Sequence, residues 1–276
     1  MATSEAKSRT AFWIFFGFFQ ILGIFSIVIF VVWECFFNKG FAWDYRNRQF
    51  AIHPLVMVLS MVVLYGQGSL TYRVVTCMNR SKVKILHLVI MGTALVLAVF
   101  GVVTVFIYHH HMNYGDMYTL HSWCGMMTVA SFALQFFLGM GILLFKGVDG
   151  NLKRSYLSLH RYGSLAILAM VGASVVSGVI DDVYLCMSNK SYRDLKLHAV
   201  VLNVMGLTSL IAVLNLMYLL YRDDWKRNAS NRSGSPEGDV PAQETRPRAP
   251  SNDDNFPPPP DYPPPPKETT SLLRHQ

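Results

Sequence analysis

The chain has 276 residues, of which 52% are hydrophobic and only 15% are charged. Ordinary soluble domains carry about 25% charged residues, so this composition excludes a typical soluble globular protein. The formal net charge is +7, but the basic residues lie mainly between long apolar segments, where membrane proteins place them. The charge therefore needs no nucleic-acid partner to explain it.

Six apolar segments are long enough to cross a membrane, for which a helix needs about 20 mostly apolar residues. Their interiors contain no acidic residue and no lysine. Because these runs are too long for transmembrane β-strands, they predict an all-α fold, a polytopic bundle of six transmembrane helices. In chain order the predicted helices are residues 12–33, 50–72, 85–108, 118–145, 162–180 and 197–221.

Lysine and arginine are distributed unequally between the two sides of the predicted bundle. The N-terminal residues 1–11, the loops after helices 2 and 4, and the segment after helix 6 carry thirteen of them, and the other side carries six. Since basic residues accumulate in short cytosolic loops, we expect both termini to be cytosolic. Residues 12–227 then form the membrane domain, and its opposite surface faces a lumen or the cell exterior.

Four histidines occur one to a helix in predicted helices 2 to 5. His53, His87, His121 and His160 are separated by 34, 34 and 39 residues, about the length of one membrane crossing plus a loop. Successive histidines therefore fall at alternating membrane faces, which pairs His53 with His121 and His87 with His160. Ionisable residues at membrane depth are usually functional, and neutral imidazole is a good axial ligand for haem iron. The spacing predicts two stacked bis-histidine haems.

The predicted cytosolic surface beside His87 and His160 is strongly basic, which favours an anionic small reductant. The same charges also satisfy the positive-inside rule. No nucleotide-binding or flavin-type glycine motif accompanies them, so we expect no built-in pyridine-nucleotide or flavin site. The basic residues are Arg73, Arg80, Lys82, Lys84, Lys153 and Arg154.

Three features are expected on the lumenal side. The run His109 to His111 is placed in the loop between helices 3 and 4, where it is either a metal or anion site or a solvated loop. Cys35 and Cys186 lie just outside the membrane surface; they either form a disulfide, as an oxidising compartment allows, or remain two free thiols. Asn189 lies in an Asn-Lys-Ser sequon and is a candidate glycosylation site.

The tail, residues 228–276, differs in composition from the bundle. Twelve of the thirteen prolines lie after residue 235, and such a segment cannot bury a core, so we expect it to be disordered. Within it, Pro-Pro-Asp-Tyr ending at Tyr262 is either a WW-domain ligand or part of an extended linker. Glu268 followed by Leu272 and Leu273 fits the acidic dileucine pattern that sorting adaptors read. That pattern favours a secretory, endosomal or lysosomal vesicle membrane and leaves the plasma membrane open.

Several stretches carry a resemblance to a known family. They are Phe-Ala-Trp-Asp at 41–44, Ile-His-Pro at 52–54, Leu-Thr-Tyr-Arg-Val at 70–74, Tyr-Thr-Leu-His-Ser-Trp-Cys-Gly at 118–125 and Asp-Trp-Lys-Arg at 224–227. With them the chain resembles the cytochrome b561 family of ascorbate-dependent transmembrane electron carriers, over residues 10 to about 227 and closest to animal chromaffin-granule-type members. The resemblance implies two b-type haems held by helices 2 to 5 and a homodimer. It also implies electron flow from cytosolic ascorbate to a lumenal acceptor, either monodehydroascorbate or ferric iron.

The resemblance also implies substrate contacts at the cytosolic face. Arg73 and Lys84 match family positions that serve ascorbate, and Arg80 stands where members often have a second basic residue. The family usually has an arginine seven residues before the helix 5 histidine, where this chain has Lys153, with Arg154 shifted by one. Lysine lacks the bidentate fork that arginine offers a carboxylate-like anion.

At the lumenal face the resemblance implies a second substrate site. It gives the same histidine pairing, with the His53 pair at the lumenal haem and the His87 pair at the cytosolic haem. The implied lumenal substrate contacts are His109, Tyr118 and, as a substitute within the histidine run, His110.

Two other functions remain open on the residues alone. A metal or proton transporter that uses histidines as relays would usually also place carboxylates at membrane depth, and the six segments have none. A haem subunit of a larger membrane redox complex would more often carry two ligands on one helix. Bis-histidine ligation leaves no open iron position, so we expect no oxygen activation.

Overall fold

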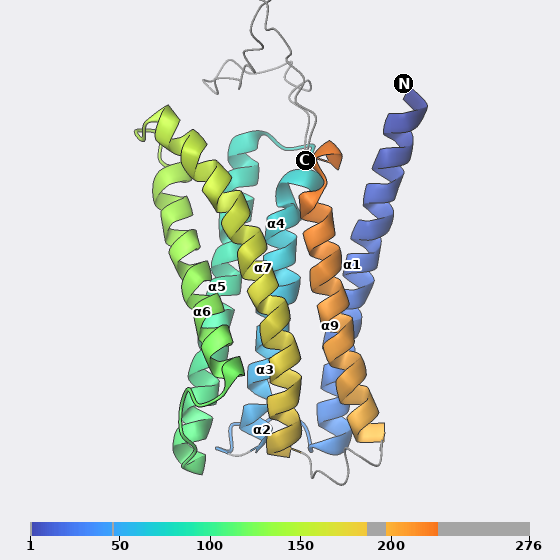
Figure 1. The fold of residues 1–276 in the computed structure, drawn as a ribbon, viewed down its shortest axis with the longest axis vertical. Coiled ribbons are helices and arrows are strands. Elements are labelled where there is room, and N and C mark those ends of the chain that lie inside the picture. The colour runs from blue at the N-terminus through green and yellow to red at the C-terminus, as the bar shows by residue number, and fades with distance from the viewer. Residues whose placement is uncertain (1, 46, 187–196, 226–276) are drawn as a thin grey trace, which may run out of the picture. The chain divides into compact units, whose positions relative to one another are not determined.

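The computed structural model describes residues 2–45, 47–186 and 197–225. In this part of the chain, six helical runs are long and apolar enough to cross a membrane, which confirms the predicted all-α membrane bundle. Figure 1 shows the runs side by side, with α1 beginning and α9 ending at the same end of the bundle. The predicted glycosylation site at Asn189 and the tail motifs at Tyr262, Leu272 and Leu273 lie outside the described residues.

Short connections join the helices along the chain. The second span is built from several consecutive helices, and the fourth span ends in a short π-helix. In chain order the elements are α1 (Ala2–Phe37), α2 (Asn47–Phe50), α3 (Ile52–Met57), η1 (Val58–Leu64), α4 (Tyr65–Val74), α5 (Arg80–Met112), α6 (Leu120–Gly139), η2 (Met140–Leu144), α7 (Gly150–Cys186), α9 (Leu197–Tyr221) and η3 (Asp223–Trp225).

Side-chain caps fix the points at which three of the long helices begin. Asn79 caps α5, Thr119 caps α6 and Asp149 caps α7, and each side-chain oxygen accepts backbone N–H groups of the following turn. These N–H groups have no partner within the helix itself. Because α5, α6 and α7 carry three of the four paired histidines, the caps help to set where those histidines lie.

Two helices extend well beyond their apolar segments. The last turn of α5 contains His109 to His111, so the prediction that this run lies in a loop was wrong. The first turns of α7 contain Lys153 and Arg154, which the sequence also placed in a loop. Hydropathy marks only the part of a helix that lies in hydrocarbon, whereas a cap can start the helix several turns earlier. Histidines at a helix C-terminus also interact favourably with the helix dipole.

The second span departs from regular α-helix geometry. Between α3, which carries His53, and α4, the chain passes through the π-helix η1, whose hydrogen bonds skip one residue more than in an α-helix. Ser60, Met61 and Val62 of η1 are buried. Such segments often occur at functional sites. Because η1 is wound differently from an α-helix, the side chains of α3 point in a different direction relative to those of α4 than they would along one continuous α-helix.

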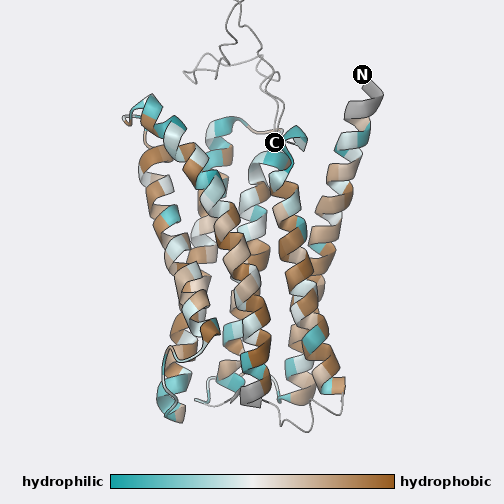
Figure 2. Cartoon of the chain, in the orientation of Figure 1, coloured by the Kyte–Doolittle hydropathy of each residue, from teal (hydrophilic) through white to brown (hydrophobic). Residues whose placement is uncertain are grey.

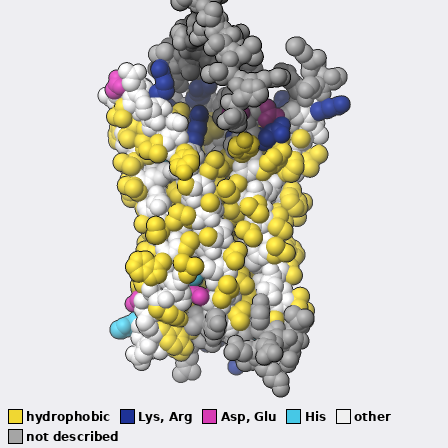
Figure 3. Space-filling view, in the orientation of Figure 1, with side chains coloured by type: hydrophobic (Ala, Val, Ile, Leu, Met, Phe, Trp, Pro, Cys, Tyr) yellow, Lys and Arg dark blue, Asp and Glu magenta, His cyan; other side chains and the backbone are white. Residues whose placement is uncertain are grey.

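The outer faces of the bundle are apolar as well as its core. Figures 2 and 3 show hydrophobic residues over the middle of the helices and polar residues nearer the ends. Large apolar side chains such as Ile14 and Val96 are exposed, as expected where lipid replaces water. Inside, Tyr65 of α4 packs edge-on against Phe132 of α6, with ring centres 5.0 Å apart. Aromatic side chains therefore fill part of the interior between α4 and α6.

Candidate functional site

The four histidines of spans two to five meet as two pairs. The ring centres of His53 and His121 lie 6.2 Å apart, and those of His87 and His160 lie 6.4 Å apart. These are the pairs that the spacing predicts. Each pair joins helices that are distant in sequence, since α3 faces α6 and α5 faces α7.

The separation of each pair suits one iron between two imidazoles. A metal–imidazole bond is about 2 Å long and the ring centre lies roughly 1 Å further on, so two axial imidazoles place their centres roughly 6 Å apart. Both measured separations agree with this value. The donor set of two neutral nitrogens is the one that a six-coordinate b-type haem takes.

Backbone carbonyls orient three of the four rings. The Nδ1 atom of His53 lies 2.9 Å from the carbonyl oxygen of Gly101, that of His87 lies 2.8 Å from Gly68 O, and that of His121 lies 2.9 Å from Ser174 O. A carbonyl can only accept, so in each ring Nδ1 donates and Nε2 keeps its lone pair. This arrangement is typical of metal-binding histidines.

His160 is held differently from the other three. Its Nδ1 is buried and has no hydrogen-bond partner among the described residues. Tyr156, one turn earlier on α7, packs against the ring with the centres 5.9 Å apart. Packing rather than a carbonyl acceptor therefore orients this imidazole.

Glycines on the facing helix make room for two of the rings. A Cβ added at Gly178 of α7 would lie 2.9 Å from the Cε1 atom of His121, and one added at Gly139 of α6 would lie 3.2 Å from Cε1 of His160. Atoms at the first distance would have to shift, and at the second they are unusually tight. Each helix of this pair thus carries a glycine where the other presents its histidine. The residues present fit a haem at both pairs.

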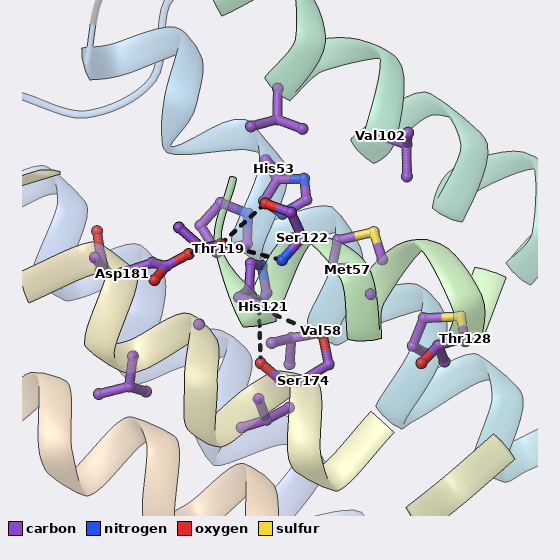
Figure 4. A pocket seen from close by; sticks show the side chains of 18 of the residues that line it. His53, Met57, Val58, Val102, Thr119, His121, Ser122, Thr128, Ser174 and Asp181 are labelled. Carbon is purple, nitrogen blue, oxygen red and sulfur yellow. Dashed lines mark hydrogen bonds between the residues drawn. The ribbon is translucent and has the colours of Figure 1, made fainter. Parts of the chain in front are cut away.

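A cavity opens beside His53 and His121. Figure 4 shows the two imidazoles directed into it, with Met57 of α3 and Ser174 of α7 on its walls. Its lining also includes residues near the end of the bundle at which α5 ends and α6 begins, namely His109, Asp116, Tyr118, Asp181 and Asp182. We call this group the acidic mouth. It joins the histidine pair to the surface of the bundle.

Two short contacts organise the acidic mouth. Asp116 accepts a hydrogen bond from His109, with Oδ1 and Nδ1 3.3 Å apart. Asp181 accepts one from the hydroxyl of Thr119, the cap of α6, at 2.7 Å. The sequence predicted His109 and Tyr118 here, and their ring centres lie 6.4 Å apart. The carboxylates were not predicted, because α7 contributes Asp181 and Asp182 from beyond the apolar segment.

His110 and the cysteines stand apart from the cavity. The His110 ring packs against His111 with the centres 5.6 Å apart, and His110 does not line the cavity. Within the described residues, no group of three or more His, Cys, Asp or Glu side chains could hold a metal ion. Cys35 is exposed and forms no disulfide with another described cysteine, and the side chain of Cys186 lies outside the described part of the chain. The disulfide stays a prediction.

The other end of the bundle is basic. Figure 3 shows Lys and Arg side chains gathered at the end where α1 begins. Four of these charges lie in the first turns of two histidine helices, with Arg80 and Lys82 on α5 and Lys153 and Arg154 on α7. Lys84 also lies on α5, one turn before His87. We call Arg80, Lys82, Lys84, Lys153 and Arg154 the basic face.

Arg73 is bound to the protein itself. One terminal nitrogen donates to the carbonyl oxygens of Leu219 and Arg222 at 2.6 and 2.7 Å, and the other donates to that of Leu220 at 2.6 Å. These carbonyls end α9 and have no partner within their helix, and a cation there interacts favourably with the helix dipole. Arg73 thus ties α4 to α9, and its role as a substrate contact stays a prediction.

Replacing Arg73 by glutamine should mainly reduce stability. The variant loses three hydrogen bonds from a charged donor, and we expect the free energy of unfolding to fall by about 1–3 kcal/mol, less than the sum of the bonds because the group is partly exposed. Lys84→Gln is the matched control on the neighbouring helix. A lower melting temperature for Arg73→Gln alone, measured in detergent, is the expected result. Equal melting temperatures would show that the three bonds contribute little.

A polar cluster beyond α9 holds the start of α1. Arg222 donates to both carboxylate oxygens of Asp224 at 2.8 Å, and the hydroxyl of Ser8 donates to the same carboxylate at 2.7 Å. These hydrogen bonds, those from Arg222 above all, hold the pKa of Asp224 well below its usual range. The indole of Trp225 donates to Ser8 at 3.0 Å. The carboxylate therefore stays ionised at neutral pH and joins α1 to η3.

Comparison with known proteins places this geometry in context. The model of the eukaryotic cytochrome b561 family matches residues 52–186, which include all four paired histidines. The chain is 32% identical over 224 residues to a transmembrane ascorbate-dependent reductase from Bos taurus, which covers 81% of this chain and 88% of the relative. It is 35% identical over 210 residues to a lysosomal membrane ascorbate-dependent ferrireductase from Homo sapiens, which covers 75% and 87%.

Proposed function

Because the chain belongs to the cytochrome b561 family, we propose that it is a transmembrane ascorbate-dependent oxidoreductase. It takes electrons from ascorbate at the basic face and delivers them to an acceptor at the acidic mouth. The observation that carries this proposal is that four histidines form two pairs, one toward each end of a membrane-spanning bundle. The ring centres are 6.2 Å apart in the His53–His121 pair and 6.4 Å apart in the His87–His160 pair.

Two b-type haems fit the histidine pairs. His53 and His121 would hold one, and His87 and His160 the other; when bound, the haems supply reversible one-electron chemistry. The backbone carbonyls of Gly101, Gly68 and Ser174 accept hydrogen bonds from three of the four ligands and hold those rings in place. Two carriers divide the roughly 30 Å hydrocarbon core into shorter steps.

The donor site lies at the basic face. Cations in the first turn of a helix are unfavourable, because the helix N-terminus already carries a partial positive charge. Arg80, Lys82, Lys153 and Arg154 occupy that position on two helices. An anion such as the ascorbate monoanion would relieve this repulsion and gain attraction from both helix ends. The positive-inside rule then makes this end, and with it both termini, cytosolic.

The acceptor site lies in the acidic mouth, and its charge distinguishes two acceptors. The cavity is lined by three carboxylates, Asp116, Asp181 and Asp182, and its lining among the described residues includes no lysine or arginine. Such a surface attracts a cation and repels an anionic radical such as monodehydroascorbate. We therefore favour ferric iron as the acceptor. The name of the human relative, a lysosomal ferrireductase, supports this choice and a vesicle membrane.

Removing charge from the acidic mouth should weaken the use of iron. In sealed proteoliposomes loaded with ascorbate, we expect Asp116→Asn combined with Asp181→Asn to raise the KM for ferric iron outside by about tenfold, which corresponds to 1.4 kcal/mol. Reduction of the haems by ascorbate should not change. Asp44→Asn, which removes a carboxylate outside the cavity, is the control. Unchanged KM for iron in the double variant would exclude the acidic mouth as its site.

The remaining contacts are proposed from sequence alone. We propose a homodimer, as the family resemblance implies, and contacts of the tail with a WW domain through Tyr262. Leu272 and Leu273 would be read by a sorting adaptor that directs the protein to a vesicle membrane. Co-precipitation with WW domains, and localisation after replacement of both leucines by alanine, test the two tail motifs separately.

A further inference from the structure

Glu34 is a buried carboxyl group that the proposed function does not use. It lies in the last turn of α1, one residue beyond the predicted apolar segment, and is only 3% exposed. The carboxyl group interacts with the side chain of Asn38, but its Oε2 atom is buried and has no hydrogen-bond partner among the described residues. Buried polar atoms are nearly always paired, so this unpaired oxygen calls for a functional explanation.

A second carboxylate connects Glu34 to a histidine pair. Asp182 of α7 interacts electrostatically with Glu34, and it lines the cavity into which His53 and His121 are directed. The helices α3 and η1 also pack against α1, and between them they carry no titratable side chain except His53. The negative charge that Glu34 faces therefore comes from α7, at the edge of the cavity.

The helix α9 contributes a histidine at the same end of the bundle. The His198 ring packs against Trp33 and Phe37 of α1, with centres 4.9 and 4.8 Å away. Glu34 lies between these two residues in the sequence. Lys39 follows in the turn after α1 and lines a separate surface cavity. Among the described residues, no lysine or arginine forms an ion pair with Glu34.

These surroundings favour the protonated form of Glu34. Burial makes the ionised carboxylate unfavourable, and no described cation compensates for its charge. The nearby charge of Asp182 acts in the same direction. An electron that arrives at the His53–His121 pair adds a further negative charge beside the cavity, so a proton on Glu34 becomes more favourable still. Electron and proton therefore stabilise each other, and this coupling is reciprocal.

We propose that Glu34 takes up one proton when an electron reaches the His53–His121 pair and releases it when the electron leaves. This inference rests on the proposed function and adds a residue that couples electron transfer to lumenal pH. The electron comes from the His87–His160 pair, and a lumenal hydronium ion gives its proton to the carboxylate, leaving water. When ferric iron takes the electron and becomes ferrous, the carboxylic acid returns the proton to water. An acidic lumen therefore favours electron arrival.

The midpoint potentials of the two haems test this coupling. The full-length, haem-loaded protein in nanodiscs is titrated with redox mediators from mildly acidic to mildly alkaline pH. Unit charges roughly 12 Å apart in a protein interior change each other's equilibria by about tenfold. We therefore expect one potential to fall by about 59 mV in total as the pH rises, the equivalent of a tenfold change for a one-electron couple. Glu34→Gln should remove this fall, and Glu34→Asp should retain it.

Infrared difference spectra report the proton directly. Reduction of the wild type should raise the C=O stretch of a protonated carboxylic acid, and Glu34→Gln should lack this band. Asp44→Asn is the matched control, because Asp44 is a carboxylate at the same end of the bundle that already accepts a hydrogen bond from Arg48 at 2.8 Å. This control should keep both the band and the pH dependence.

His198 is the other group near this position that takes up a proton in the same pH range. His198→Ala should keep the pH dependence, and the absorption spectrum of each variant verifies that both haems remain. Retention of the pH dependence in Glu34→Gln would overturn the inference, as would its loss in His198→Ala. If Glu34→Gln does not fold, the wild type decides, because potentials independent of pH and no carboxylic acid band on reduction contradict proton uptake. A purified protein without haem would contradict the proposed function itself.

Discussion

Replacing His121 by alanine should halve the haem content of the purified protein. In the wild type the ring centres of His53 and His121 lie 6.2 Å apart, and the variant removes the second imidazole that a six-coordinate site needs. The His87 and His160 pair is unchanged. His160→Ala should likewise remove the other haem and abolish fast reduction by ascorbate. Pyridine haemochromogen assays give the haem-to-protein ratio, and stopped-flow absorbance gives the reduction rate.

His198 provides the control for this experiment. It is also a histidine in a membrane-spanning helix, but its ring packs against Trp33 and Phe37, with centres 4.9 and 4.8 Å away, and lines no part of the cavity. His198→Ala should therefore retain both haems. Two haems in His121→Ala, or normal reduction kinetics in His160→Ala, would refute the ligand assignment.

The Gly178→Val substitution should displace the haem that His53 and His121 would hold, although it replaces neither histidine. The added Cβ would meet Cε1 of His121 at 2.9 Å. The ring cannot easily move, because its Nδ1 is hydrogen-bonded to the carbonyl oxygen of Ser174. Helix propensity alone would make the variant more stable, since glycine in a helix interior destabilises a helix by about 0.5–1 kcal/mol relative to alanine. A loss of haem would therefore report the steric conflict. The measurement is again the haem-to-protein ratio, together with the melting temperature.

Gly141→Val is the matched variant for this test. Apart from its chain neighbours and the backbone of its own helix, no described atom lies within 4 Å of a Cβ built at Gly141, so the extra side chain has open space and both haems should remain. Full haem content in Gly178→Val would show that the helices can separate to accept the side chain. The close fit between α6 and α7 would then have no bearing on cofactor binding.

The sequence was sufficient to predict which histidines meet. Their spacing of about one crossing per histidine fixes depth, and depth pairs His53 with His121 and His87 with His160. Depth does not depend on how the helices rotate, so no knowledge of packing was needed. The composition of the segments likewise determined the membrane bundle, because only helices of this length satisfy their backbone groups in lipid.

Other features depend on which helix faces meet, and the sequence could not predict them. The glycines that admit the imidazoles, Gly178 and Gly139, look like any others in an apolar run. In the sequence Arg73 looks like any other basic residue of the predicted cytosolic loops, although its guanidinium donates hydrogen bonds to the last carbonyl oxygens of α9. Asp116 lies in the connection between α5 and α6, whereas Asp181 lies on α7, and the two line the same cavity only once these helices have packed together.

The most direct test of the account is an absorption spectrum of the purified full-length protein before and after ascorbate is added. The two imidazole pairs predict a Soret band of six-coordinate b-type haem, two haems per chain, and conversion to the reduced spectrum on addition of ascorbate. Absence of a Soret band would contradict both haem sites. Haem that dithionite reduces but ascorbate does not would contradict the donor assignment and favour a subunit that receives its electrons from a protein partner.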